Sequence, residues 1–137
     1  RKKPRLRLGA KAKRGLKARV RELTGRNRGR SLRQVVADLA RYLNGWKAYF
    51  GVCQTPSVLR ALDSWILRRL RLLQWRHWKR GRTRYRELRR RGLPKERALI
   101  CANSELGPWR KSRSPGMSEA LPVSHLRGLG VPRLAPH

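Results

Sequence analysis

The chain has 137 residues, of which 37 are Lys or Arg and 7 are Asp or Glu, so its formal net charge is +30. Self-repulsion of that size opposes compaction unless a polyanion neutralises it, which indicates nucleic acid or an anionic membrane surface as the partner. The hydrophobic share of 39% and the five Trp are too high for a disordered basic tail, so one small domain or two very small ones are expected.

Membrane insertion and secretion are not indicated. No apolar run approaches the roughly 18 residues that a membrane span needs. No apolar stretch follows the charged N-terminus, as it would in a signal peptide. With Cys53 and Cys101 interpreted as ordinary reduced thiols, the sequence predicts a cytoplasmic protein that associates with nucleic acid and not with a membrane.

The first residues differ in pattern from those that follow. Residues 1–9 are expected to form an extended basic arm, because Pro4 disfavours helix and leucines alternate with arginines there. This arm either clamps phosphates or carries spare charge at the end of a fragment. A helical period begins at Ala10 and ends at Gly25. The buried face of this helix is predicted to hold Ala12, Leu16, Val20 and Leu23.

Two further helices follow with clear start signals. Ser31 and Gln34 form a capping box, in which each side chain bonds a free backbone N–H of the first turn. Apolar residues then recur at helical spacing as far as Phe50. Thr55 and Pro56 open the third and longest helix, expected to reach about residue 79.

The chain after residue 80 has a different texture. Short helices are expected at about 83–91, which Gly92 ends, and at about 94–103, and Pro and Gly then break the chain repeatedly. The predicted fold is therefore all-α, a small three-helix bundle followed by a smaller, irregular helical unit. The predicted domain boundaries are a helical domain at 10–80 and a basic region at 81–137.

The third helix carries a second stripe on the side away from its apolar face, spaced so that its members share one helical face. Arginine forks grip phosphates, and exposed indoles stack on unpaired bases, so the stripe predicts a nucleic-acid surface. The alternative for its two indoles is burial beneath the second unit. The stripe consists of Arg60, Ser64, Arg68, Arg71, Trp75 and Trp78.

Basic residues are dense between Lys79 and Arg91, where Glu87 is the one acid. Each phosphate contact releases counterions, so binding through this segment should weaken steeply with salt. The signal for a polyanion is strong, whereas that for sequence specificity is weak.

Catalytic signals are weak throughout. No two acids form a close pair on one face that would hold a divalent ion. The two cysteines and three histidines have no zinc spacing, and no Gly-rich phosphate loop precedes a helix. We therefore expect no catalytic residue, no metal ligand and no cofactor in this chain.

Several motifs in a fixed order resemble the C-terminal part of bacterial group II intron reverse transcriptases, namely the maturase-specific domain X (thumb) and the DNA-binding region after it. They are residues 43–50 (LNGWKAYF), 55–58 (TPSV), 62–66 (LDSWI), 68–71 (RRLR), 78–86 (WKRGRTRYR), 107–115 (GPWRKSRSP) and 120–122 (ALP).

The resemblance implies a thumb-like helical domain that grips intron RNA and helps the intron to splice. It also implies contact with target DNA during intron mobility, and a polymerase domain before Arg1. The residues expected to bind RNA are Lys11, Arg14, Lys17, Arg21, Arg60, Arg68, Arg71, Trp75, Trp78, Lys79 and Arg80. Those expected to bind DNA are Arg82, Arg84, Tyr85, Arg86, Arg89, Arg90, Trp109, Arg110, Lys111 and Arg113.

The sequence also departs from the complete pattern of that family. No Tyr-Ala-Asp-Asp polymerase motif is present and no nuclease domain follows residue 137, so this chain alone is expected not to be an enzyme. Gly81 stands where many relatives have Pro. The alternative hypothesis is a free-standing basic structural protein, associated with the ribosome or the nucleoid.

Overall fold

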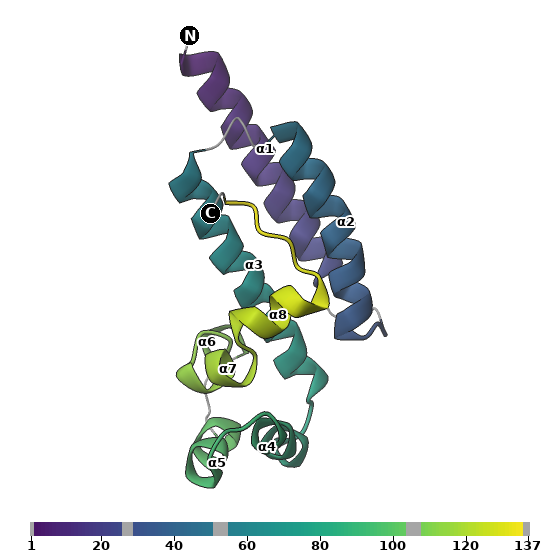
Figure 1. Cartoon of the computed structure of the whole chain (residues 1–137), viewed down its shortest axis with the longest axis vertical. Coiled ribbons are helices and arrows are strands. Elements are labelled where there is room, and N and C mark those ends of the chain that lie inside the picture. Colours follow the sequence, from purple (N-terminus) through teal and green to yellow (C-terminus); the bar gives the residue numbers. More distant parts are fainter. Residues whose placement is uncertain (1, 26–28, 51–54, 104–107, 136–137) are drawn as a thin grey trace. The chain divides into compact units, whose positions relative to one another are not determined.

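A computed structural model of the chain describes residues 2–25, 29–50, 55–103 and 108–135. Every regular element in these ranges is a helix, and they contain no strand (Figure 1), which confirms the predicted all-α class. The helices are α1 (Lys2–Leu23), α2 (Leu32–Phe50), α3 (Pro56–His77), α4 (Gly81–Arg90), α5 (Lys95–Asn103), α6 (Pro108–Lys111), α7 (Pro115–Ala120) and α8 (Val123–Leu129).

The N-terminal segment corrects one prediction. Residues 2–9 are not an extended arm but the first turns of α1. Pro4 is compatible with this because a first helical turn leaves its amide hydrogens unbonded, so the missing N–H of proline costs nothing there.

The predicted start signals are largely confirmed. The Ser31 amide donates to Gln34 Oε1 at 2.9 Å, and the Gln34 amide donates to Ser31 Oγ at 3.2 Å. These two bonds are the capping box, and α2 begins directly after it. The third helix begins at Pro56 as expected, and Gly92 follows α4 with a φ of 102° that a side chain would strain.

The chain forms two compact units, each with its own core. The first unit comprises Arg1–Ile66 and Arg127–His137, and the second comprises Leu67–Leu126. The change of unit thus falls within α3, earlier than the predicted boundary at residues 80 and 81, and the C-terminal residues return to the first unit. The predicted boundary between residues 80 and 81 stays a prediction.

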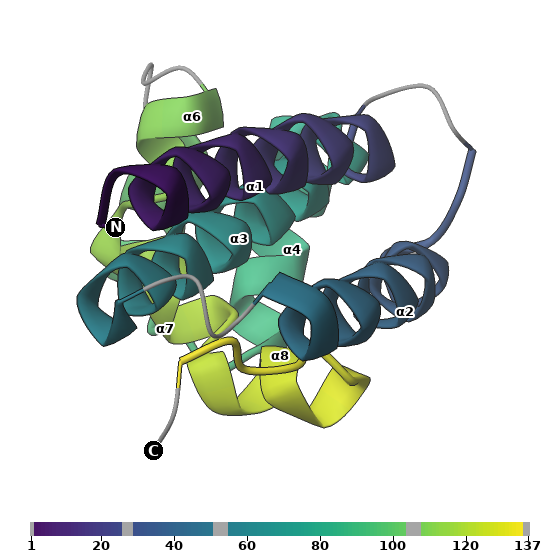
Figure 2. The same ribbon diagram turned by 90° about the horizontal axis from the view of Figure 1, so that it is seen from above.

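Helices α1 and α2 pack against each other in the first unit, and α1 also lies beside the first half of α3 (Figures 1 and 2). Their apolar stripes form an aliphatic core, as the periodicity predicts. The Trp46 indole Nε1 donates to the Ala12 carbonyl oxygen at 3.2 Å and so joins α2 to α1. The fully buried side chains of this core include Leu16, Leu39, Leu43, Leu62 and Ile66.

The C-terminal segment at residues 130–135 is held to the first unit by polar bonds. The buried Asp63 carboxylate accepts the backbone N–H groups of Leu134 and Ala135 at 2.9 and 3.0 Å. The Lys47 ammonium donates to the Arg133 carbonyl oxygen at 2.8 Å. A buried carboxylate that loses such partners is costly, so Asp63 fixes this segment on α3.

An aromatic core fills the second unit. Trp75 and Trp78 are 2% and 6% exposed and lie 6.4 Å apart, edge to face. Tyr85 packs against the same core from α4. Its other members are Leu88, Leu93, Ala98, Cys101, Ala102, Met117, Ala120 and Leu121. The prolines that predicted chain breaks stand at or just before short helices here, namely α6, α7 and α8.

Candidate nucleic-acid interface

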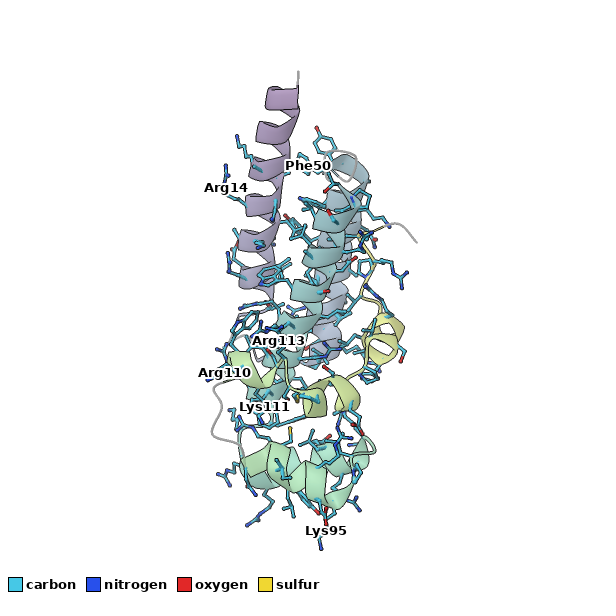
Figure 3. The ribbon with its side chains drawn as sticks, turned by 90° about the vertical axis from the view of Figure 1, so that its left-hand side faces the viewer. Arg14, Phe50, Lys95, Arg110, Lys111 and Arg113 are labelled. Carbon is cyan, nitrogen blue, oxygen red and sulfur yellow. The ribbon has the colours of Figure 1, made fainter. Side chains whose placement is uncertain are left out.

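The predicted cations of α1 face outward. Lys11, Arg14 and Arg21 are exposed and Lys17 is half-buried, whereas the opposite face of the helix is in the core. Figure 3 shows Arg14 on the outer side of α1. Arg60, at the exposed side of α3 in the same unit, also lies in solvent. All five predicted RNA-binding cations of the first unit are therefore outside its aliphatic core.

The stripe predicted along α3 is wrong in its second half. Trp75 and Trp78 are buried in the aromatic core, because α4, α5 and α7 cover that side of the helix. Base stacking on these indoles is thus excluded in this conformation, and the alternative of burial in the second unit holds. Arg71 is half-buried, and its Nε donates to the Leu121 carbonyl oxygen at 2.9 Å; burial lowers the pKa of this guanidinium.

The arginines of α4 divide into two groups, of which one belongs to the core. The Arg84 guanidinium lies 4.3 Å from the Trp75 ring centroid, and its Nη2 donates to the Trp75 carbonyl oxygen at 3.3 Å. Arg91, just after the helix, lies 4.9 Å from the Trp78 ring and pairs with Glu87. These guanidiniums are cation–π partners of the two buried indoles. Arg84, which was predicted to bind DNA, is therefore engaged in the packing of the second unit.

The second group faces solvent. Arg89 is exposed but donates through Nη1 to the Leu93 carbonyl oxygen, and Arg90 is exposed with its Nη1 3.7 Å from Glu87. The remaining exposed cations in and before this helix are Lys79, Arg80, Arg82 and Arg86.

A second cationic surface in this unit surrounds α6. The Arg68 guanidinium lies 3.7 Å from the Trp109 ring centroid. Its Nη2 and Nε donate to the Trp109 carbonyl oxygen at 2.9 and 3.3 Å, and Nε also reaches Ser112 Oγ at 3.3 Å. Because Ser112 is fully buried and itself bonds the Trp109 carbonyl, the guanidinium is held in a fixed position.

Arg113 adds a like charge at this surface. Desolvation, and secondly the charge of Arg113, lower the pKa of Arg68, although a guanidinium remains charged at neutral pH. No ion pair with an acid involves Arg68 or Arg113 in the part of the chain that the structure describes. Arg68 was predicted to bind RNA and Arg113 DNA, yet the fold brings them into one site suited to an anion.

The two residues between Trp109 and Ser112 have opposite environments. Arg110 is exposed, whereas Lys111 is 2% exposed and its Nζ donates to the Cys101 carbonyl oxygen at 2.9 Å. In Figure 3 Arg110 lies at the outer side of α6, and Lys111 lies on the side toward α5. Lys111 is thus an internal residue, and its prediction as a DNA ligand is wrong for this conformation.

Two features were missed from the sequence. Trp65 is half-buried, and two cations of α1, Lys17 and Arg21, lie over its ring. The structural role of Arg91 was also missed. Spacing along α3 separates Trp65 from the predicted stripe, so only the packing of α1 against α3 reveals the first contact.

The described residues contain no group of three His, Cys, Asp or Glu side chains close enough to hold a metal ion. Cys101 is a free, buried thiol, and Cys53 lies outside the described residues. The absence of cofactors and of catalytic residues therefore stays a prediction. None of the described helices is long and apolar enough to cross a membrane.

Comparison with known proteins gives one family. Residues 13–92 match the family described as the group II intron, maturase-specific domain. The match begins in α1 and ends just after α4, so it spans parts of both units. No curated protein matches the chain.

Proposed function

Since the chain belongs to the family of group II intron maturase-specific domains, we propose that it binds intron RNA and helps that RNA to reach its splicing-active fold. Membership implies a maturase function with intron RNA as the partner. We further propose that the second unit contacts the DNA target during intron mobility, and that a polymerase domain of the same protein precedes the chain.

The family match is the observation that supports this proposal most strongly, because it covers residues 13–92, a majority of the chain. The matched segment includes the outward cations Arg14 of α1, Arg60 of α3 and Arg82 of α4. Exposed cations that have no acid beside them are what a phosphate backbone requires.

The arrangement suggests a division of roles. The first unit offers the exposed cations of α1 and Arg60, which we assign to intron RNA together with Lys79 and Arg80. We assign two surfaces of the second unit to DNA: the outer face of α4 (Arg82, Arg86 and Arg90) and the surface at α6 (Trp109, Arg110 and Arg113). Arg68 would bind a phosphate of the RNA or DNA strand that contacts the surface at α6. Phosphate contacts of this kind position a nucleic acid and carry little sequence information.

Chemistry is assigned to other parts of the system. The maturase-specific domain is not the catalytic polymerase domain, and intron splicing is carried out by the RNA. We therefore propose that the chain acts by binding alone, and that it incorporates no nucleotide on a primed template.

The proposal is tested by titrating the full chain with a group II intron RNA at several salt concentrations. The expected result is tight binding at about 0.15 M salt, with an affinity that falls steeply as salt rises. The double variant Lys11→Ala, Arg14→Ala should lower the salt slope by roughly one unit for each lost phosphate contact.

The matched control removes the same charge from α2, in the exposed residues Arg33 and Arg41. Arg33→Ala with Arg41→Ala should leave the slope nearly unchanged. A chain that stays helical by circular dichroism yet ignores the intron RNA at this ionic strength contradicts the proposal, as does equal loss in the two double variants.

A further inference from the structure

Trp65 lies on α3 within the first unit and belongs neither to the aliphatic core nor to the stripe predicted for RNA. Its side chain is half-buried. The Lys17 ammonium and the Arg21 guanidinium of α1 each lie 5.4 Å from the centroid of its ring. One indole therefore holds two cations that come from a neighbouring helix.

These two cations would otherwise disfavour each other. Lys17 and Arg21 are one helical turn apart, a spacing at which like charges destabilise a helix. The negative face of an indole attracts both, and so offsets part of their repulsion. The ring thereby keeps two positive groups close together at the surface of α1.

A pair of cations fixed in this way suits a phosphate group. Lysine supplies a compact charge and arginine a fork of donors. Because their side chains are already ordered by the ring, less rotamer freedom is lost when a phosphate binds.

The surroundings are open and carry mainly positive charge, and the one acid of α1, Glu22, pairs with Arg19. Arg14, one turn before Lys17, is exposed on the outer side of α1 (Figure 3). On α3, Ala61 lies one turn before Trp65 and Ser64 directly before it; both are exposed, small and uncharged. A phosphate backbone can therefore approach the cation pair from solvent.

We propose that Lys17, Arg21 and Trp65 form a phosphate-binding site for the intron RNA backbone, in which Trp65 is a positioning residue. The inference rests on the proposed function and names a site for it. Since the ring is engaged by the two cations, Trp65 acts through them and not by stacking on a base.

The test is a double-mutant cycle measured as affinity for a group II intron RNA. Lys17→Ala with Arg21→Ala should lower the salt slope by about one to two units, in accord with the loss of two phosphate contacts. Trp65→Leu should weaken binding roughly three- to tenfold, as expected for loss of ordering in two ligands. Adding Trp65→Leu to the double variant should cost nothing further, because residues that act as a unit are not additive.

Arg33→Ala with Arg41→Ala is the matched control, since it removes the same charge from exposed positions of α2 without touching the indole. Its effect on the salt slope should be smaller than that of the Lys17 and Arg21 double variant. Equal effects of the two double variants overturn the inference. This comparison does not need the Trp65→Leu variant, so it holds even if that variant does not fold. The inference is also overturned if the folded Trp65→Leu variant binds the RNA with wild-type affinity. The same holds if Trp65→Leu weakens the binding of the double variant further. In both cases the proposed function stands. A wild-type chain that does not bind the RNA removes both.

Discussion

The two units use their arginines in different ways. In the first unit the core is mainly aliphatic, with one buried indole at Trp46, and the cations of α1 remain outside it. In the second unit the core contains two indoles, and guanidiniums complete it: Arg84 lies over Trp75, and Arg91 lies over Trp78. The number of arginines in a dense run therefore overstates the charge that is free at the surface, because some of these arginines pack against the core.

The buried polar groups differ in part between the units. The first unit uses a buried acid, Asp63, to accept backbone N–H groups of the C-terminal segment, while the exposed Lys47 and the half-buried Arg127 bond carbonyl oxygens there. The second unit uses bases: Arg71 bonds the Leu121 carbonyl, and Lys111 bonds the Cys101 carbonyl. Backbone carbonyls take the place that acids would otherwise have, which suits a chain with 7 acids and 37 Lys and Arg.

The largest expected effect concerns the aromatic core. Trp75→Ala removes a fully buried indole together with the ring that Arg84 covers, so the free energy of unfolding should fall by about 3–5 kcal/mol. Urea unfolding followed by circular dichroism measures this. Tyr49→Ala, at a side chain that is 77% exposed, should stay within about 0.5 kcal/mol of wild type. A loss of less than about 1 kcal/mol for Trp75→Ala contradicts the importance of the indole.

A smaller effect is expected at Asp63. Asp63→Asn replaces one acceptor oxygen by an amide group, so one of the two N–H groups of Leu134 and Ala135 loses its partner. The expected cost is about 1–3 kcal/mol. Hydrogen exchange should quicken at these two amides before the rest of the first unit.

Asp38→Asn is the control for that variant, because Asp38 forms a partly exposed ion pair with Arg30 at 2.7 Å. Such pairs contribute at most about 1 kcal/mol. Equal losses of stability for the two Asp→Asn variants contradict a special role for Asp63.

The smallest effect is expected at the start of α2. Ser31→Ala removes the hydroxyl that accepts the Gln34 amide, and should lower the free energy of unfolding by about 1 kcal/mol. Thermal unfolding compares it with wild type. No measurable change means that water replaces the hydroxyl, and that the capping box does not stabilise the first unit.

Local signals predicted much of the fold. The start of α2 at its capping box, the start of α3 at Pro56 and the end of α4 before Gly92 all depend on neighbouring residues, and each was predicted correctly. The N-terminal arm was predicted wrongly because Pro4 was taken as a helix breaker, although proline is tolerated in a first turn.

Contacts between residues far apart in the sequence could not be predicted from the local sequence pattern. Asp63 bonds residues that are 71 and 72 positions away. Trp75 and Trp78 have the spacing of an exposed stripe, and only the return of α4, α5 and α7 over that face buries them. The cations of α1 were placed correctly because helical period alone separates them from the apolar face. Whether these residues bind RNA and DNA stays a prediction.

The division of arginines in the second unit is tested most directly by two double variants that remove the same charge. Binding to double-stranded DNA is measured against salt for Arg82→Met with Arg86→Met, and for Arg84→Met with Arg91→Met. The first pair should lower the salt slope by about one to two units and leave the stability nearly unchanged. The second pair should leave the slope unchanged and lower the free energy of unfolding. Equal slopes in the two double variants would contradict the separation of packing arginines from binding arginines.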